Sequence, residues 1–150
     1  MCGIAGIFSV DSISENQKGL LKDAMWAMKY RGPDYTGYFS DDHYLVGHNR
    51  LSIIDTTSNA NQPMISTDAN FVLSFNGEIF NFRQLKSELL KEGIHFNTDS
   101  DTEVLLHLLM KEGKNALAKL NGFFALSFYD KKNNQVLLAR DRFGEIPLIY

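Results

Sequence analysis

The sequence has 150 residues, of which 44% are hydrophobic and 22% are charged, and its formal net charge is -3 at pH 7. That length suffices for one domain with a buried core, and the slight negative charge argues against a general nucleic-acid-binding surface. The single cysteine excludes an internal disulfide framework, and four scattered histidines do not make a structural zinc pattern. No apolar run reaches the length of a membrane span, and no signal-peptide pattern is present. We therefore expect a cytoplasmic protein without a metal site, membrane contact or nucleic-acid partner.

The only cysteine stands at the start of the chain, in Met1-Cys2-Gly3-Ile4-Ala5-Gly6. If Met1 is removed, Cys2 carries a free α-amine beside its thiol. An α-amine titrates near ~7.7–8.0 and a thiol near ~8.5, so the amine is an adequate base for the thiol at neutral pH. One residue then supplies both nucleophile and base, which is the N-terminal-nucleophile arrangement. Judged by position alone, the alternative is a cysteine that frays with the terminus and has no function.

The first third of the chain predicts a strand followed by a helix. Residues 3–8 have the pattern of a short buried strand. Ser14 then opens a helix through a capping box with Gln17, and apolar residues follow at helical spacing. The helix is expected to end near Tyr30, because a Gly-Pro pair follows. Its methionines and Trp26 are expected to fill the core.

Strand and helix patterns alternate through the rest of the chain. Asn81 and Ser100 precede apolar helical periods and are expected as N-caps, Ser100 in a second capping box. An Asn-Gly pair usually forms a turn, so one strand should end before residue 76. An apolar run from residue 146 has the pattern of a further strand, and we expect the single domain, 1–150, to be incomplete at its C-terminus. The predicted elements are strands 35–41, 43–49 and 71–75, helices 81–91 and from 101, and strands 123–129 and 135–139.

Three polar features stand at the ends of these elements. The planar guanidinium of Arg50 suits a carboxylate, although most arginines are simply solvated. Asn76 and the backbone N–H of Gly77 could together form an oxyanion hole, although the pair is equally typical of a turn. Asp101 could face an ammonium group, although an acid in a first helical turn also complements the helix dipole.

Seven segments match the motifs of a known family, in the family's order and across nearly the whole chain. On these residues the sequence resembles the glutaminase domain of class II glutamine amidotransferases, and most of all the amino-terminal domain of glutamine-dependent asparagine synthetases. The segments are Met1-Cys2-Gly3-Ile4, Arg31-Gly32-Pro33-Asp34, Arg50-Leu51-Ser52-Ile53-Ile54-Asp55, Asn76-Gly77-Glu78-Ile79-Phe80-Asn81, Ser100-Asp101-Thr102-Glu103, Gly122-Phe123-Phe124-Ala125 and Arg140-Asp141-Arg142-Phe143-Gly144.

The resemblance implies an α+β fold, a four-layer αββα sandwich of the N-terminal-nucleophile hydrolase type. It implies that glutamine is hydrolysed through a γ-glutamyl thioester on the cysteine. It also implies a role for each matching position: Cys2 as nucleophile, Asn76 and Gly77 as oxyanion hole, Arg50 for the α-carboxylate of L-glutamine, Leu51, Ser52, Ile53 and Ile54 lining the pocket, Glu78 and Asp101 for the α-ammonium group, and residues 31–34 in a loop that closes over the substrate.

Partners and cofactors follow from the same resemblance. This domain needs no cofactor, whereas ATP and Mg belong to a synthetase domain, in cis or in trans, whose pyrophosphate motif is absent from this sequence. The sequence departs from the family pattern at Glu145-Ile146, just before Pro147. The alternatives are a catalytically silent domain that binds an amino acid or docks on a partner, and a fragment of a synthetase that uses the ammonia elsewhere. Homodimer formation stays open.

Overall fold

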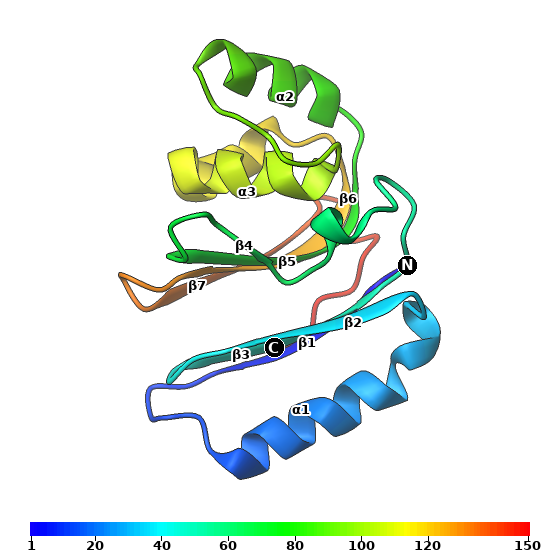
Figure 1. The fold of residues 1–150 in the computed structure, drawn as a ribbon, viewed down its shortest axis with the longest axis vertical. Helices are drawn as coiled ribbons and strands as arrows, with labels where there is room; N and C mark the ends of the chain where they lie inside the picture. Colours follow the sequence, from blue (N-terminus) through cyan, green and yellow to red (C-terminus); the bar gives the residue numbers. More distant parts are fainter.

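Two antiparallel β-sheets lie face to face between helical layers in the computed structural model, which describes residues 1–150 (Figure 1). One sheet has three strands in the order β1-β3-β2, and the other has four in the order β4-β5-β6-β7. Helix α1 covers the outer face of the first sheet, and α3 covers the outer face of the second, with α2 packed on α3 (Figure 1). The four-layer αββα prediction is therefore confirmed.

The three-stranded sheet is made of β1 (Gly3–Phe8), β2 (Tyr35–Ser40) and β3 (Tyr44–Arg50). The predicted strand and hairpin are confirmed, and β3 lies in the centre, so its residues are all buried. The facing sheet covers one side of this sheet, and α1 covers the other. The register places Ile4 of β1 beside His48 of β3. The strand that begins one residue after the cysteine is thus held by the most buried strand of its sheet.

Helix α1 (Glu15–Ala27) begins at the predicted capping box, in which Ser14 and Gln17 bond each other's backbone. It buries Leu21 and Met25 against the sheet, and a 3-10 turn (Lys29–Arg31) follows. The expectation for Trp26 was wrong: its side chain is 81% exposed, because it projects from the solvent side of the helix. The periodicity fixed which stripe faces inward, and Trp26 is not part of that stripe.

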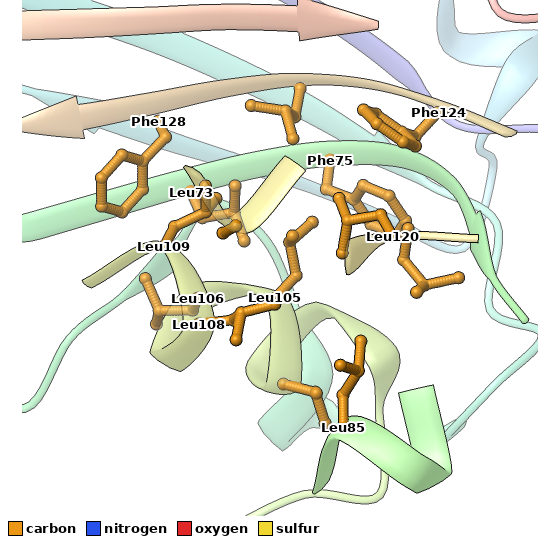
Figure 2. Close-up of a cluster of buried hydrophobic side chains, with 14 of the residues drawn as sticks. Leu73, Phe75, Leu85, Leu105, Leu106, Leu108, Leu109, Leu120, Phe124 and Phe128 are labelled. Atoms are coloured by element: carbon orange, nitrogen blue, oxygen red, sulfur yellow. The ribbon is translucent and has the colours of Figure 1, made fainter. Parts of the chain in front are cut away.

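The four-stranded sheet is made of β4 (Met64–Ile65), β5 (Phe71–Ile79), β6 (Gly122–Asp130) and β7 (Gln135–Arg140). Its outer face packs on α3 (Asp101–Glu112) and, through α3, on α2 (Phe82–Lys91). Figure 2 shows this core, in which phenylalanines and leucines of the strands meet leucines of the helices. Short 3-10 segments occupy Ser58–Ala60 and Gly113–Lys119.

Two local predictions in this half need correction. Strand β5 continues through the Asn76-Gly77 pair to Ile79, because its ladder with β6 extends to Gly122. Asn81 stands at the N-cap of α2 without capping it. Its side chain instead donates to the Lys119 carbonyl at 2.9 Å and accepts from the N–H of Asn121 at 3.0 Å.

The second capping box is only half formed. The Ser100 hydroxyl accepts from the N–H of Glu103 at 3.2 Å, as predicted. The Glu103 carboxylate does not return to Ser100, and accepts from the N–H of Thr98 at 2.7 Å instead. The same carboxylate also accepts from the N–H of Asn97 at 2.9 Å. It therefore fixes the loop that leads into α3.

The chain beyond β7 turns around the carboxylate of Asp141. This side chain accepts hydrogen bonds from the N–H groups of Phe124, Phe143, Glu145 and Ile146, at 3.0–3.3 Å. The further strand predicted from residue 146 does not form in the structure, where residues 146–150 have no regular secondary structure. None of the helices is long and apolar enough to cross a bilayer.

Candidate active site

A cavity of about 130 Å³ opens where the ends of β1, β3 and β5 meet the first turn of α3. It brings together every residue predicted for the site except Ser52. The Ser52 N–H donates to the Asp34 carboxylate at 2.7 Å, which ties its loop to the preceding Gly-Pro-Asp turn. The cavity is lined by Met1, Cys2, Arg50, Leu51, Ile53, Ile54, Ala60, Gln62, Phe75, Asn76, Gly77, Glu78, Ser100, Asp101, Thr102 and Phe123.

Cys2 is held by contacts from three segments. Its N–H donates to Oδ1 of Asn76 at 2.9 Å, and Nε of Arg31 donates to its carbonyl at 3.1 Å. The N–H of Leu51 lies 3.4 Å from its Sγ. Burial raises the pKa of the Cys2 thiol, and the Leu51 N–H opposes that effect because it stabilises the thiolate. The thiol is thus held at the cavity wall beside a backbone donor.

Strand β5 presents one side of its backbone to the cavity. Strand β4 pairs only with Val72 and Leu73, so this side of β5 is open beyond Leu73. Gly77 lies opposite Phe124, whose N–H and carbonyl are both bonded to Asp141 on the other side of β6. The pair is therefore a non-hydrogen-bonded one, and the N–H of Gly77 points away from β6 into the open side.

The neighbouring donors on this side of β5 are already occupied. Oε1 of Gln62 accepts from the N–H of Phe75 at 2.7 Å, and Oδ2 of Asp101 accepts from the N–H of Ile79 at 3.1 Å. The N–H of Gly77 between them faces the cavity. Only glycine fits at this position, since its φ is +152° and a Cβ would lie 2.1 Å from the Phe123 carbonyl oxygen. This geometry can donate a hydrogen bond to an oxyanion.

Arg50 ends β3 with its guanidinium at the cavity and only 5% of the residue exposed. Nη1 donates to the Thr57 carbonyl and to Oδ1 of Asn61, each at 2.8 Å, and Nη2 donates to the Asp55 carbonyl. These bonds fix the guanidinium against the following loop. Nε and one hydrogen of Nη2 remain for a further acceptor, because a guanidinium has five donors.

Two acids line the same cavity as this arginine. Asp101, in the first turn of α3, is 5% exposed, and Glu78 follows Gly77 on β5. Burial raises the pKa of Asp101 to about 6, and the nearby charge of Glu78 contributes to the increase. The hydrogen bond from Ile79 only partly offsets these effects. A cationic group in the cavity would relieve the cost of this buried charge.

Comparison with known proteins identifies the family. A family model described as a glutamine amidotransferase domain matches residues 1–150. The chain belongs to this family. It is 42% identical over 152 residues to asparagine synthetase [glutamine-hydrolyzing] 1 of Bacillus subtilis, covering 100% of this chain and 24% of the relative. It is 37% identical over 150 residues to asparagine synthetase B [glutamine-hydrolyzing] of Escherichia coli, covering 99% and 26%.

Solved structures agree on the fold of this amidotransferase domain. Glutamine phosphoribosylpyrophosphate amidotransferase from B. subtilis superposes with a TM-score of 0.74 at 23% identity, over 94% of this chain and 37% of that one. An allosteric regulatory enzyme of purine biosynthesis superposes with a TM-score of 0.57 at 24% identity, over 92% and 31%. The domain spans about a quarter of the length of the curated relatives it matches.

Three polar residues of this amidotransferase site were missed from the sequence: Gln62, Ser100 and Thr102. Gln62 bonds the N–H of Phe75 and, through Nε2, lies 3.4 Å from Oγ1 of Thr102 on α3. All three line the cavity and are buried. The sequence predicts no helix or strand at Gln62, and Ser100 and Thr102 stand in the segment of the predicted second capping box. Neither local pattern indicates the contact between Gln62 and Thr102, because it joins segments that are 40 residues apart in the sequence.

Proposed function

We propose that this domain hydrolyses the side-chain amide of L-glutamine to glutamate and ammonia, with Cys2 as the nucleophile after removal of Met1. The observation that carries the proposal is the arrangement of the cavity. A thiol, an amide with a free backbone N–H, a guanidinium and two acids line one space of about 130 Å³. Glutamine carries a carboxylate, an ammonium group and a neutral amide, and each finds a complementary group there.

The reaction would begin at the terminal residue itself. Its α-amine takes the thiol proton, directly or through a water, and the thiolate attacks the carboxamide carbon. The oxygen that becomes negative accepts from the N–H of Gly77 and from Nδ2 of Asn76. The structure favours this use of Asn76, because its Oδ1 already accepts from the backbone N of Cys2, which leaves the amide nitrogen free to turn toward the substrate. Losing one such donor typically costs ~10²–10³ in rate.

The tetrahedral intermediate then breaks its carbon–nitrogen bond. The α-ammonium group of Cys2 returns its proton to the leaving nitrogen, and ammonia departs. The γ-glutamyl group stays on sulfur as a thioester. Water, activated by the same amine, attacks this thioester, and glutamate is released with the thiol restored.

Substrate recognition would rest on the charged groups around the nucleophile. Arg50 would bind the α-carboxylate, while Glu78 and Asp101 would receive the α-ammonium group. An analogue that lacks the amine would leave the buried Asp101 charge without a partner, and such a site rejects that analogue strongly. Leu51, Ile53 and Ile54 line the same cavity, whereas Ser52 stands outside it.

The parent activity that we propose is asparagine synthesis with glutamine as the nitrogen donor. The two curated relatives described above match 99–100% of the chain, and both are named as glutamine-hydrolysing asparagine synthetases. Ammonia would then pass to a synthetase domain, in cis or in trans, that uses ATP and Mg. Homodimer formation and a cytoplasmic location stay predictions, as does the absence of a cofactor from this domain.

The test is glutamate release from glutamine by the purified chain, measured beside an intact mass that reports on Met1. Release is expected from molecules that have lost Met1, and Cys2→Ala should abolish it with an unchanged melting temperature. Arg50→Ala should mainly raise the KM for glutamine. Full activity in Cys2→Ala would disprove the nucleophile. No release from a chain without Met1 would favour the alternative of a silent binding domain.

A further inference from the structure

His48 is a buried histidine that the proposed reaction does not use. It lies in the centre of β3, and its side chain is fully buried. Its Nε2 lies 3.1 Å from the carbonyl oxygen of Phe75 on β5. A carbonyl only accepts, so Nε2 carries the proton and donates it. Its Nδ1 has no hydrogen-bond partner in the structure, which is costly for a buried polar atom and needs an explanation.

The hydrogen bond joins the two sheets next to the candidate active site. Cys2 precedes β1 of one sheet, whereas Asn76 and Gly77 belong to β5 of the other. His48 pairs in register with Ile4, two residues after the cysteine. Its acceptor, Phe75, directly precedes Asn76. The distance between nucleophile and oxyanion donors therefore depends on how the sheets are placed at this point.

Both backbone polar groups of Phe75 are held by side chains. Its carbonyl accepts from His48, and its N–H donates to Oε1 of Gln62 at 2.7 Å. Because β4 has ended, no strand bonds this side of β5 here. These two side chains replace the missing strand immediately before the Asn76-Gly77 pair.

We infer that His48 is a positioning residue, which donates Nε2–H to Phe75 and thereby fixes Asn76 and Gly77 relative to Cys2. This inference rests on the proposed function. Burial lowers the pKa of His48 to about 4, and the positive charge of Arg50 adds to the effect, so the ring is neutral and keeps one donor at neutral pH. A displacement of about 1 Å in such a constellation can cost about 10²-fold in rate.

The test compares two amide substitutions that differ only in reach. His48→Gln can place an amide nitrogen near the position of Nε2, whereas His48→Asn is too short. We expect His48→Asn to lower kcat for glutamine about 10- to 100-fold with KM changed by less than about twofold, and His48→Gln to restore most of kcat. In His48→Asn, the inhibition constant of glutamate γ-semialdehyde should rise by a factor similar to the loss in kcat. Cys2 would add to that aldehyde, with the thiol proton passing to the new oxygen, which then sits in the oxyanion hole.

Tyr44→Phe is the matched control. The Tyr44 hydroxyl bonds Oγ of Ser127 at 2.7 Å and also joins the two sheets, but its partner belongs to β6, whereas His48 bonds Phe75 of β5 directly before Asn76. It should lower the melting temperature and leave kcat and aldehyde inhibition near the wild-type values. Equal kcat losses in Tyr44→Phe and His48→Asn would reduce His48 to a stabilising contact and overturn the inference.

Further outcomes separate the inference from the proposed function. An active wild type together with a fully active His48→Asn overturns the inference alone. A wild type that lacks Met1 and releases no glutamate contradicts the proposed function. If His48→Asn does not fold, nitrogen NMR of the wild type decides: the ring must be neutral with its proton on Nε2 at pH 7, and the Nδ1–H tautomer would overturn the inference.

Discussion

Asp101 and Asp141 are each 5% exposed, and yet the structure shifts their pKa values in opposite directions. Burial raises the pKa of both carboxyls. At Asp141 the N–H groups of Glu145, Ile146 and Phe124 outweigh burial and hold the pKa well below its usual range. At Asp101 the Ile79 N–H compensates burial only in part, and the pKa rises to about 6.

These opposite pKa shifts distinguish a carboxylate that stabilises the fold, Asp141, from one whose charge lacks enough partners until a ligand binds, Asp101. The charge of Asp141 is solvated by the backbone of its own turn, so it stabilises the protein without any other molecule. The charge of Asp101 faces a cavity and a second acid, Glu78, so in the free protein its ionisation costs stability. A bound ammonium group would reverse that cost, which is the role proposed for it with glutamine.

Asp141→Asn should cause the largest effect. Asparagine keeps one acceptor oxygen, and its NH2 group would confront N–H groups that now donate to the carboxylate. We expect the melting temperature at pH 7 to fall by about 10 °C, as measured by circular dichroism. The wild-type advantage exists above the unfolded pKa of about 3.9 and is lost as pH falls through the lower folded pKa. An unchanged melting temperature in Asp141→Asn would contradict the structural role of this charge.

Asp101→Asn should act in the opposite direction on stability. It removes a poorly solvated charge and can still accept from Ile79 through its oxygen. We expect the melting temperature at pH 7 to rise by about 5 °C, while the KM for glutamine rises by about 10²-fold. Calorimetry and initial rates check the two effects. Loss of stability together with unchanged KM would make Asp101 a structural residue like Asp141.

Glu78→Gln should have the smallest effect. The contribution of Asp101 to wild-type stability should decrease as pH rises from about 4 to about 6, because the folded Asp101 holds its proton more tightly than the unfolded chain does. Removing the Glu78 charge lowers the pKa of Asp101 and weakens this decrease. The melting temperature at pH 7 should rise by about 1–2 °C, the scale of an exposed charge. Thermal scans of the wild type and of Glu78→Gln from pH 4 to 8 measure the difference between their melting temperatures at each pH.

Local chemistry explains which elements the sequence predicted well. The capping box at Ser14, the helix from residue 101 and the strands 3–8 and 135–139 all rest on signals between near neighbours. The predictions that failed depended on distant partners. Asn76-Gly77 reads as a turn until β6 continues the ladder beside it. Asn81 has the type of an N-cap, but its side chain bonds residues about 40 positions away.

The sequence by itself determined the family, the nucleophile candidate and the residue types of the site, because these reside in short motifs such as Met1-Cys2-Gly3-Ile4. Only the tertiary structure decided which of those residues share a cavity, since Ser52 stands outside it and Gln62 lies within it. Only the tertiary structure also distinguished Asp101, whose pKa is raised, from Asp141, whose pKa is lowered. The energy of a buried charge depends on how many N–H groups surround it, and those groups come from segments that meet only when the chain folds.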